Sequence, residues 1–409
     1  MNLKVTFLLL MTAITSVYAR QALTMDESIQ LALKNNLQVK ADEYTLQSFQ
    51  QLKKTHSDLG KTNLSWTHGQ YNSLNKDNNI TISQTIPFPT VIAQQLKLGE
   101  TQLEGSRLSL SVTRNELIYQ VSNVYLQLSY LKSLHQVLLS QDSLYSGFVK
   151  ASDLRFKTGE SNLLEKTSAE TQMLEIKNQL TQNEAEIGIY KTQLQTIINT
   201  TEVPEISELL YKLVIENNDS SLHQNPLLLL SKQQVVINRQ VKKVEQGRFL
   251  PDITVGYFNQ SLTGFQRIDN DEVYFDRSKR FSGFQLGIAV PLWFVPQAGK
   301  AKAAQYTEAA SQKKYEYMQA SMKNNLIQAQ QELEKNEINL NYYESSALKS
   351  AALILRQSQK AFQSGEIGYL EYLIAVKNAH TIRTNYLSAL NQYNQSILRI
   401  KYLQGENQK

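Results

Sequence analysis

The sequence predicts a mainly α-helical chain of two equivalent halves, in which long helical hairpins are joined to short pairs of membrane-type β-strands. Three observations predict this fold class: a repeat of about two hundred residues, the placement of the prolines, and a change of hydrophobic period from about 3.6 to 2. Together they give two long hairpins and four strands per chain.

A duplicated segment shows that the chain has two halves. Phe-Lys-Thr-Gly-Glu at 156–160 returns as Phe-Gln-Ser-Gly-Glu at 362–366, and in both copies Leu-Glu follows at the same spacing. This period is too long for a solenoid repeat. We therefore predict one structural repeat over 20–200 and a second over 221–409, joined by a connector at 201–220.

The N-terminus is typical of a secretory signal peptide over residues 1–19. Lys4 precedes an apolar stretch too short to span a bilayer, and the small residues Val17 and Ala19 mark cleavage after Ala19. An uncleaved anchor is the alternative. The chain has no cysteine, which excludes disulfides and acylation at an N-terminal cysteine.

The charge balance argues against a nucleic-acid partner. Forty-two Lys and Arg face 37 Asp and Glu, and the small basic excess is spread along the chain rather than clustered. Beyond the signal no apolar run approaches 18 residues. If the mature chain crosses a membrane, it must do so with strands.

Proline placement marks out two long helices. None of the seven prolines lies in 90–203 or 297–409, and proline is excluded from helix interiors. Both tracts carry a 3-4 alternation of mostly apolar residues, typical of packed helices. The sequence predicts helices over about 91–157 and 297–363, each roughly 100 Å long at about 1.5 Å per residue. The alternating positions are Leu117, Val121, Val124, Leu128, Leu131, His135 and Leu138, then Leu326, Ala329, Leu333, Asn336, Leu340, Tyr343 and Ala347.

Each long helix is expected to end at a repeated glycine, Gly159 or Gly365. Glycine adopts the left-handed conformation that terminates helices. Helical patterning then resumes through Ile198 and Leu403, so each long helix and its successor form an antiparallel hairpin.

Between the helices apolar residues alternate with polar or small ones, which predicts two strand pairs. The connecting loops are expected at Asn72 to Asn79 and at Thr263 to Arg280. Runs of this length with one apolar face are typical of membrane-barrel strands. Trp66 and Trp293 fall where an interfacial aromatic girdle is expected. The apolar positions are Leu64, Trp66, Ile80, Ile82, Ile253, Val255, Tyr257, Phe284, Leu286, Ile288 and Val290.

Four strands cannot close a barrel, because about eight is the smallest number that does. Three copies would supply twelve strands and leave no edge unpaired. The sequence therefore favours a trimer. The alternative is a pair of soluble hairpins that cap a helical rod.

This duplicated order of elements resembles the TolC-like outer-membrane efflux protein family over essentially the whole mature chain. The resemblance implies a homotrimer with a 12-stranded β-barrel in the outer membrane and a helical tunnel, an α-barrel, in the periplasm. Residues 199–220 would contribute to a belt around the tunnel. The implied partners are a periplasmic adaptor protein, an inner-membrane pump and outer-membrane lipid.

The same resemblance implies roles for particular residues. Gly159, Glu160, Gly365 and Glu366 correspond to the periplasmic tip that contacts the adaptor, with a simple helix stop as the alternative. Glu165 and Glu371 correspond to an acidic ring inside the tip that attracts cations. The alternative for these two is a solvated helix face.

No catalytic motif is present, and no enzyme activity, cofactor or metal site is predicted. The five histidines are isolated, and His135 is expected to pack between helices. The acidic run at 269–272 lacks the spacing of a calcium-binding EF-hand and is expected to be a solvated loop.

The predicted function is a passive exit duct that conducts substrates from an inner-membrane pump to the exterior. The alternative is a periplasmic adaptor or structural coiled-coil protein without a pore. Metal ions, small drugs and secreted polypeptides all stay open as cargo.

Overall fold

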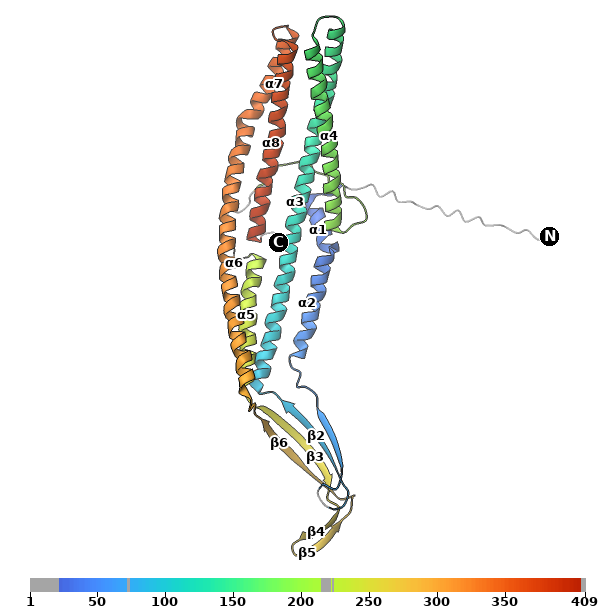
Figure 1. The fold of residues 1–409 in the computed structure, drawn as a ribbon, viewed down its shortest axis with the longest axis vertical. Coiled ribbons are helices and arrows are strands. Elements are labelled where there is room, and N and C mark those ends of the chain that lie inside the picture. The colour runs from blue at the N-terminus through green and yellow to red at the C-terminus, as the bar shows by residue number, and fades with distance from the viewer. Residues whose placement is uncertain (1–21, 72–73, 215–221, 223, 406–409) are drawn as a thin grey trace, which may run out of the picture. The chain divides into compact units, whose positions relative to one another are not determined.

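The structure is a computed structural model that describes residues 22–71, 74–214, 222 and 224–405 (Figure 1). The signal peptide at 1–19 lies outside these residues. The chain forms two compact units, and each draws segments from both sequence repeats. Within the described part of the chain, no helix is both long and apolar enough to span a membrane.

The first unit, here called the helical unit, contains residues 22–35, 120–214 and 334–396. It includes helix α1 (Met25–Asn35), the later part of α3 (Pro89–Lys157) and α4 (Leu163–Ile198). From the second repeat it takes the end of α6 (Phe294–Tyr342), then α7 (Leu348–Gln363) and most of α8 (Tyr369–Gln404). The two predicted hairpins are confirmed as α3–α4 and α7–α8.

An aromatic and aliphatic core joins the two hairpins inside the helical unit. Tyr145 and Phe148 of α3 lie with Ala169 and Ile176 of α4. From α8, Tyr369, Leu373 and Val376 complete this buried cluster. His135 Nδ1 donates a 3.2 Å hydrogen bond to Asn183 Oδ1 of α4, so it packs between helices as predicted.

The second long helix differs from the prediction by one π-helical turn, η1 (Tyr343–Ala347), between α6 and α7. The spacing from the proline that follows the strands to the turn glycine also differs between the two repeats. Pro291 precedes Gly365 by two more residues than Pro87 precedes Gly159. A π turn is wider than an α turn and accommodates an additional residue.

The second unit, here called the sheet unit, contains 36–119, 222–333 and 397–405, apart from 72–73 and 223. Its helices are α2 (Leu37–Thr55), the start of α3, α5 (Pro226–Gly247) and the start of α6. Asn36 and Asn225 cap α2 and α5 through side-chain oxygens that accept backbone N–H groups. A core of Leu326, Ala329, Ile400 and Leu403 packs α6 against the end of α8.

The four predicted strands form one antiparallel sheet in the order β1-β2-β3-β6. Their bounds are Asn63–Gly69, Asp77–Ile86, Asp252–Ser261 and Arg280–Ala289. The predicted end of the first loop, Asn79, is wrong, because β2 already begins at Asp77.

The second predicted loop is wrong, because it contains a hairpin of β4 (Gly264–Ile268) and β5 (Asp271–Phe275). Asp269 and Asn270 both have positive φ, the conformation of a two-residue type I′ turn. In the acidic run at 269–272, Asp269 and Asn270 therefore form the hairpin turn, and the last two residues begin β5.

Candidate functional site

One face of the four-stranded sheet is apolar and exposed. Residues paired across an antiparallel sheet share a face. Leu64, Ile82, Tyr257 and Phe284 lie in one such row. Phe284, Leu286 and Ile288 of β6 are 84%, 80% and 72% exposed. An exposed apolar face of this extent is rare in water-soluble proteins. The remaining apolar members are Trp66, Ile80, Ile86, Ile253 and Val255.

The opposite face is polar or small and is nearly free of charge. Thr85 and Thr254 are hydrogen-bonded through their hydroxyls at 3.0 Å on this face. Gly283 lies opposite Phe258, whose ring occupies the space that a side chain at 283 would take. Apolar side chains therefore predominate on one face of this sheet, and polar or small ones predominate on the other, where Phe258 and Phe281 are exceptions. Other members of the polar face are Ser65, Thr67, Thr81, Ser83, Gly256, Gln260, Gln285 and Gly287.

Both outer strands of the sheet have an unpaired edge among the described residues. β1 pairs only with β2, and β6 pairs only with β3. Open edges expose a row of backbone N–H and C=O groups that other strands can pair with. The sheet therefore has an exposed apolar face and two edges at which, among the described residues, no further strand pairs.

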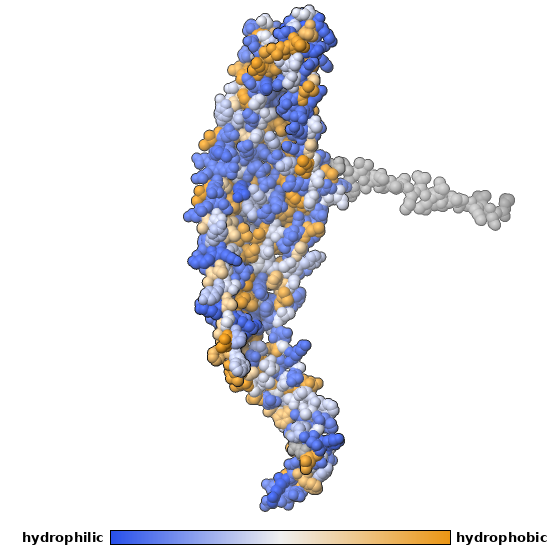
Figure 2. Space-filling model, viewed as in Figure 1, coloured by the Kyte–Doolittle hydropathy of each residue, from blue (hydrophilic) through white to orange (hydrophobic). Residues whose placement is uncertain are grey.

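The apolar face ends in polar residues at one end and in an exposed apolar run at the other. Arg280 donates to the side chain of Asn259, in the row that contains Trp66, and to that of Asn78, beyond this row. At the other end, Leu292 to Val295 lead into α6, and Trp293 is 89% exposed. Apolar side chains gather on the surface where α6 begins and near the turns of the helical unit (Figure 2).

The two hairpin turns of the helical unit have the same backbone geometry. Gly159 and Gly365 have φ of 79° and 77°. In the first turn Glu160 N–H donates to Arg155 C=O and Gly159 N–H to Phe156 C=O. The second turn repeats both bonds at positions 206 residues later. This is a Schellman motif in both copies, as expected for a glycine that ends a helix.

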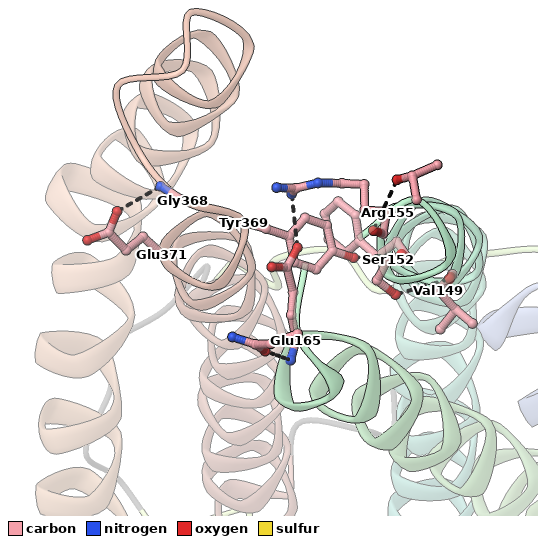
Figure 3. Close-up of polar contacts among 10 residues, drawn as sticks. Val149, Ser152, Arg155, Glu165, Gly368, Tyr369 and Glu371 are labelled. Carbon is pink, nitrogen blue, oxygen red and sulfur yellow. Dashed lines mark hydrogen bonds and ion pairs between the residues drawn. The ribbon is translucent and has the colours of Figure 1, made fainter. Parts of the chain in front are cut away.

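The predicted acidic residues Glu165 and Glu371 occupy equivalent helix positions but make different contacts (Figure 3). Glu165 forms a 2.9 Å ion pair with Arg155, and its side chain is 15% exposed. Glu371 accepts the backbone N–H of Gly368 at 2.9 Å and is exposed. The first carboxylate is thus paired within its own hairpin, whereas the second caps the start of α8.

A second ion pair crosses the first turn beside Arg155 and Glu165. Lys166 lies 2.7 Å from Asp153, which also pairs with Lys157. Hydrogen bonds from these two lysines lower the pKa of Asp153 to about 2. The carboxylate is therefore ionised at any pH above that range.

Tyr369 connects the two hairpins in the same region. Its hydroxyl donates a 2.7 Å hydrogen bond to the backbone C=O of Phe148 in α3. Its ring lies in edge contact with Phe148, and the Arg155 guanidinium sits 5.9 Å from its centroid. Burial raises the pKa of Tyr369, so its hydroxyl keeps its proton.

The structure brings together Glu165, Arg155 and Tyr369, of which the sequence predicted only Glu165. Arg155 and Glu165 are equally distant from position 160, and residues so placed face each other across a helical hairpin. That symmetry is a signal that could have identified the pair. Gly159, Glu160, Gly365 and Glu366 all lie exposed at the turns. No cluster of metal-ligating side chains occurs in the part of the chain that the structure describes.

Comparison with known proteins gives similarity in structure alone. No protein-family model matches the sequence, and no curated protein matches it. Among solved structures, CusC matches with a TM-score of 0.76 at 14% identity, over 93% of this chain and 92% of that one. The outer membrane protein VceC of Vibrio cholerae gives 0.75 at 15% identity, over 93% and 96%. The MtrE outer membrane channel of Neisseria gonorrhoeae gives 0.72 at 13%, over 93% and 88%.

These proteins are outer membrane factor channels of the TolC family. The chain has their fold over nearly its whole length, which confirms the resemblance at the level of structure.

Proposed function

We propose that this chain is the subunit of an outer-membrane channel that passively conducts substrates delivered by an inner-membrane pump and a periplasmic adaptor. Three copies would place their sheets edge to edge as a 12-stranded barrel. The helices would form the tunnel below it. The fold shared with CusC, VceC and MtrE supports this assignment.

The observation that carries the proposal is the sheet with an exposed apolar face and two open edges. Lipid would cover the apolar face, and pairing of β6 with β1 of the next copy would satisfy both edges. The polar face would then line the pore. Thr, Ser, Gln and Gly dominate that face, so the barrel wall would pass solutes without a charge filter of its own.

The aromatic residues fit the two surfaces of a bilayer. From the Trp66 row to the Ile288 row the sheet extends about 20 Å along the strands, and Trp293 lies five residues beyond Ile288. At a strand tilt of about 35–45° those ~20 Å span roughly 15 Å of the membrane, and the residues from Ile288 to Trp293 would extend the apolar band toward the roughly 25 Å typical of outer-membrane barrels. We assign Trp66 and Trp293 to opposite interfaces.

The native mass of the protein extracted by detergent from outer membranes tests the proposal, together with conductance in planar bilayers. A complex of three chains that forms discrete channels is the expected result. A monomer recovered without detergent would overturn it and favour a periplasmic adaptor or a coiled-coil rod.

At the helical turns, we assign Gly159, Glu160, Gly365 and Glu366 to adaptor contact. Leu164 and Leu370, which hold equivalent positions just after the turns, are 67% and 42% exposed. Exposed leucines next to a rigid glycine turn provide an apolar surface that a helical partner can cover.

Of the two acidic residues, Glu371 is the better candidate for a cation-attracting constriction. Arg155 compensates the charge of Glu165 inside its own hairpin. The exposed Glu371 carboxylate accepts a hydrogen bond from an uncharged backbone N–H, and it is in none of the ion pairs found among the described residues. Specificity for metal ions or small drugs would then belong to the pump.

Substitution of Tyr369 by phenylalanine is expected to loosen the contact between the hairpins. The variant removes the bond to Phe148 C=O and should cost about 1 kcal/mol of stability. Because that bond holds the second hairpin against the first, channel open probability should rise. Single-channel recording checks this, with Tyr372→Phe as the control, since Tyr372 contributes its ring to the same cluster. Equal open probability in both variants would contradict the role of the hydroxyl.

A further inference from the structure

The helical unit contains a segment that binds both hairpins away from their turns. Residues 205–214, here called the strap, follow α4 and form neither helix nor strand except at one bridge between Ile206 and Leu23. On the first hairpin, Lys132 of α3 donates to Ile206 C=O at 2.7 Å. Leu210 N–H donates to the Ser133 hydroxyl at 3.0 Å.

On the second hairpin, the strap is held by a fully buried amide. Asn394 of α8 accepts from Leu213 N–H at 2.9 Å and donates to Tyr211 C=O at 2.6 Å. An asparagine that satisfies both groups of a passing backbone fixes the position of that segment. The strap therefore has a fixed place on α8.

The strap also reaches the π-helical turn. Lys212 Nζ lies 2.8 Å from a Glu344 carboxylate oxygen, and Glu344 is the second residue of η1. The same ammonium lies 5.4 Å from the centroid of the Tyr393 ring of α8. One lysine thus joins the strap, the π turn and α8.

A π turn is a weak point in a long helix, since its wider ring disturbs the regular ladder of backbone bonds and allows bending. Beyond it lies α7, whose end carries the Gly365 turn. The first hairpin has no counterpart, because α3 is a continuous α-helix.

We propose that η1 is a hinge for the α7 arm of the second hairpin, and that the Lys212–Glu344 ion pair, here called the clasp, holds this hinge against the strap. Breaking the clasp frees the arm to move away from α3. The proposal rests on the proposed function in one respect: the movement would open the end of the tunnel.

The absence of cysteine makes a distance measurement direct. Lys150→Cys on α3 and Lys360→Cys on α7, both exposed positions, carry spin labels in the full-length protein. Dilution with unlabelled chains restricts the measured distances to one chain. Lys212→Gln is compared with Lys349→Gln, which removes the same charge from an exposed position on α7 just after the π turn.

Lys212→Gln should raise the population of the longer distance about two- to fivefold, the shift expected from a half-exposed ion pair. The exchanged pair Lys212→Glu with Glu344→Lys should restore the wild-type distribution. Deleting Ser346 in the Lys212→Gln background should narrow the distance distribution, because one residue fewer allows a regular α-helix in place of the π turn. Lys349→Gln should leave the wild-type distance distribution unchanged.

Identical distributions for Lys212→Gln and Lys349→Gln would overturn the clasp. A broad distribution after deletion of Ser346 would overturn the hinge. Conductance in planar bilayers is measured separately on the same variants. A protein that shows the distance shift but no conductance would retain the hinge and refute the proposed channel.

Discussion

Replacement of Leu286 by lysine is expected to abolish assembly in the outer membrane, whereas the same replacement at Gln285 is tolerated. The two residues are neighbours on β6 and point to opposite faces of the sheet. Leu286 is 80% exposed in the middle of the apolar face, between the rows of Phe284 and Ile288. The variants therefore differ only in which face receives the charge.

The magnitude follows from the depth of the residue in the proposed barrel. A lysine on the lipid face of an outer-membrane barrel costs about 2–4 kcal/mol near the bilayer midplane. Every copy in the assembly bears that cost. On the pore-lining face the ammonium stays in water, so Gln285→Lys should change stability little and make the channel less permeable to cations.

The measurement is the amount of trimer recovered from outer membranes, with bilayer reversal potentials for the variant that assembles. Loss of trimer for Leu286→Lys alone supports lipid contact of the apolar face. If both variants assemble equally, lipid does not cover this face. If Gln285→Lys is the one that fails, the two faces have been assigned the wrong way round.

Much of the fold follows from short-range rules that act on single residues. The absence of proline from two long tracts predicted both long helices. Proline is excluded from helix interiors because it lacks the backbone N–H and its ring clashes with the preceding turn. Glycine at 159 and 365 predicted both turns because the left-handed region favours it. The alternation of apolar and polar residues predicted the four strands, because a shift of one residue would move all the apolar side chains to the opposite face of the sheet.

The features that sequence reasoning missed depend on small differences or on distant contacts. The π turn occurs in the repeat that has two additional residues between the proline and the turn glycine, and nothing in Tyr343–Ala347 is specific to that geometry. The β4–β5 hairpin has a turn of Asp269 and Asn270 rather than the more typical Asn-Gly. Its strands are only five residues each.

The candidate site divides in the same way. Equivalence under the repeat placed Glu165 and Glu371 at matching positions, but it could not show that one pairs with Arg155 and the other caps a helix. The residue that decides this is Arg155, whose counterpart in the second repeat is Ala361. Similarly, the contact of Tyr369 with Phe148 joins residues of different repeats, which local patterns do not reveal.

Replacing both turn glycines by valine is expected to abolish efflux while leaving the trimer intact. At φ near 78° an L-residue costs roughly 1–2 kcal/mol, and a β-branched one is disfavoured further. A Cβ at Gly159 or Gly365 would meet no atom within 4 Å, so the penalty comes from the backbone conformation rather than from a clash. The Schellman bonds to Arg155 and Ala361 should then be lost, and both turns should change shape.

Asparagine at both positions is the matched variant, because it tolerates the left-handed region while adding a side chain. Gly147→Ala is a further control. Gly147 lies inside α3 without positive φ, also has open space at its Cβ, and should gain about 0.5–1 kcal/mol. Efflux in cells, the native mass and cross-linking to the adaptor are measured for each variant.

Comparison of the valine and asparagine pairs separates two roles that a glycine can have at a tip. If asparagine supports efflux and valine does not, the turn conformation is what the partner requires. If the asparagine variant also loses cross-linking to the adaptor while its trimer stays intact, the adaptor contacts the bare backbone of the turns. No side chain then fits between the turn and the adaptor. Full efflux with valine at both positions would contradict the tip assignment, because a channel that works with reshaped turns does not engage its partner through them.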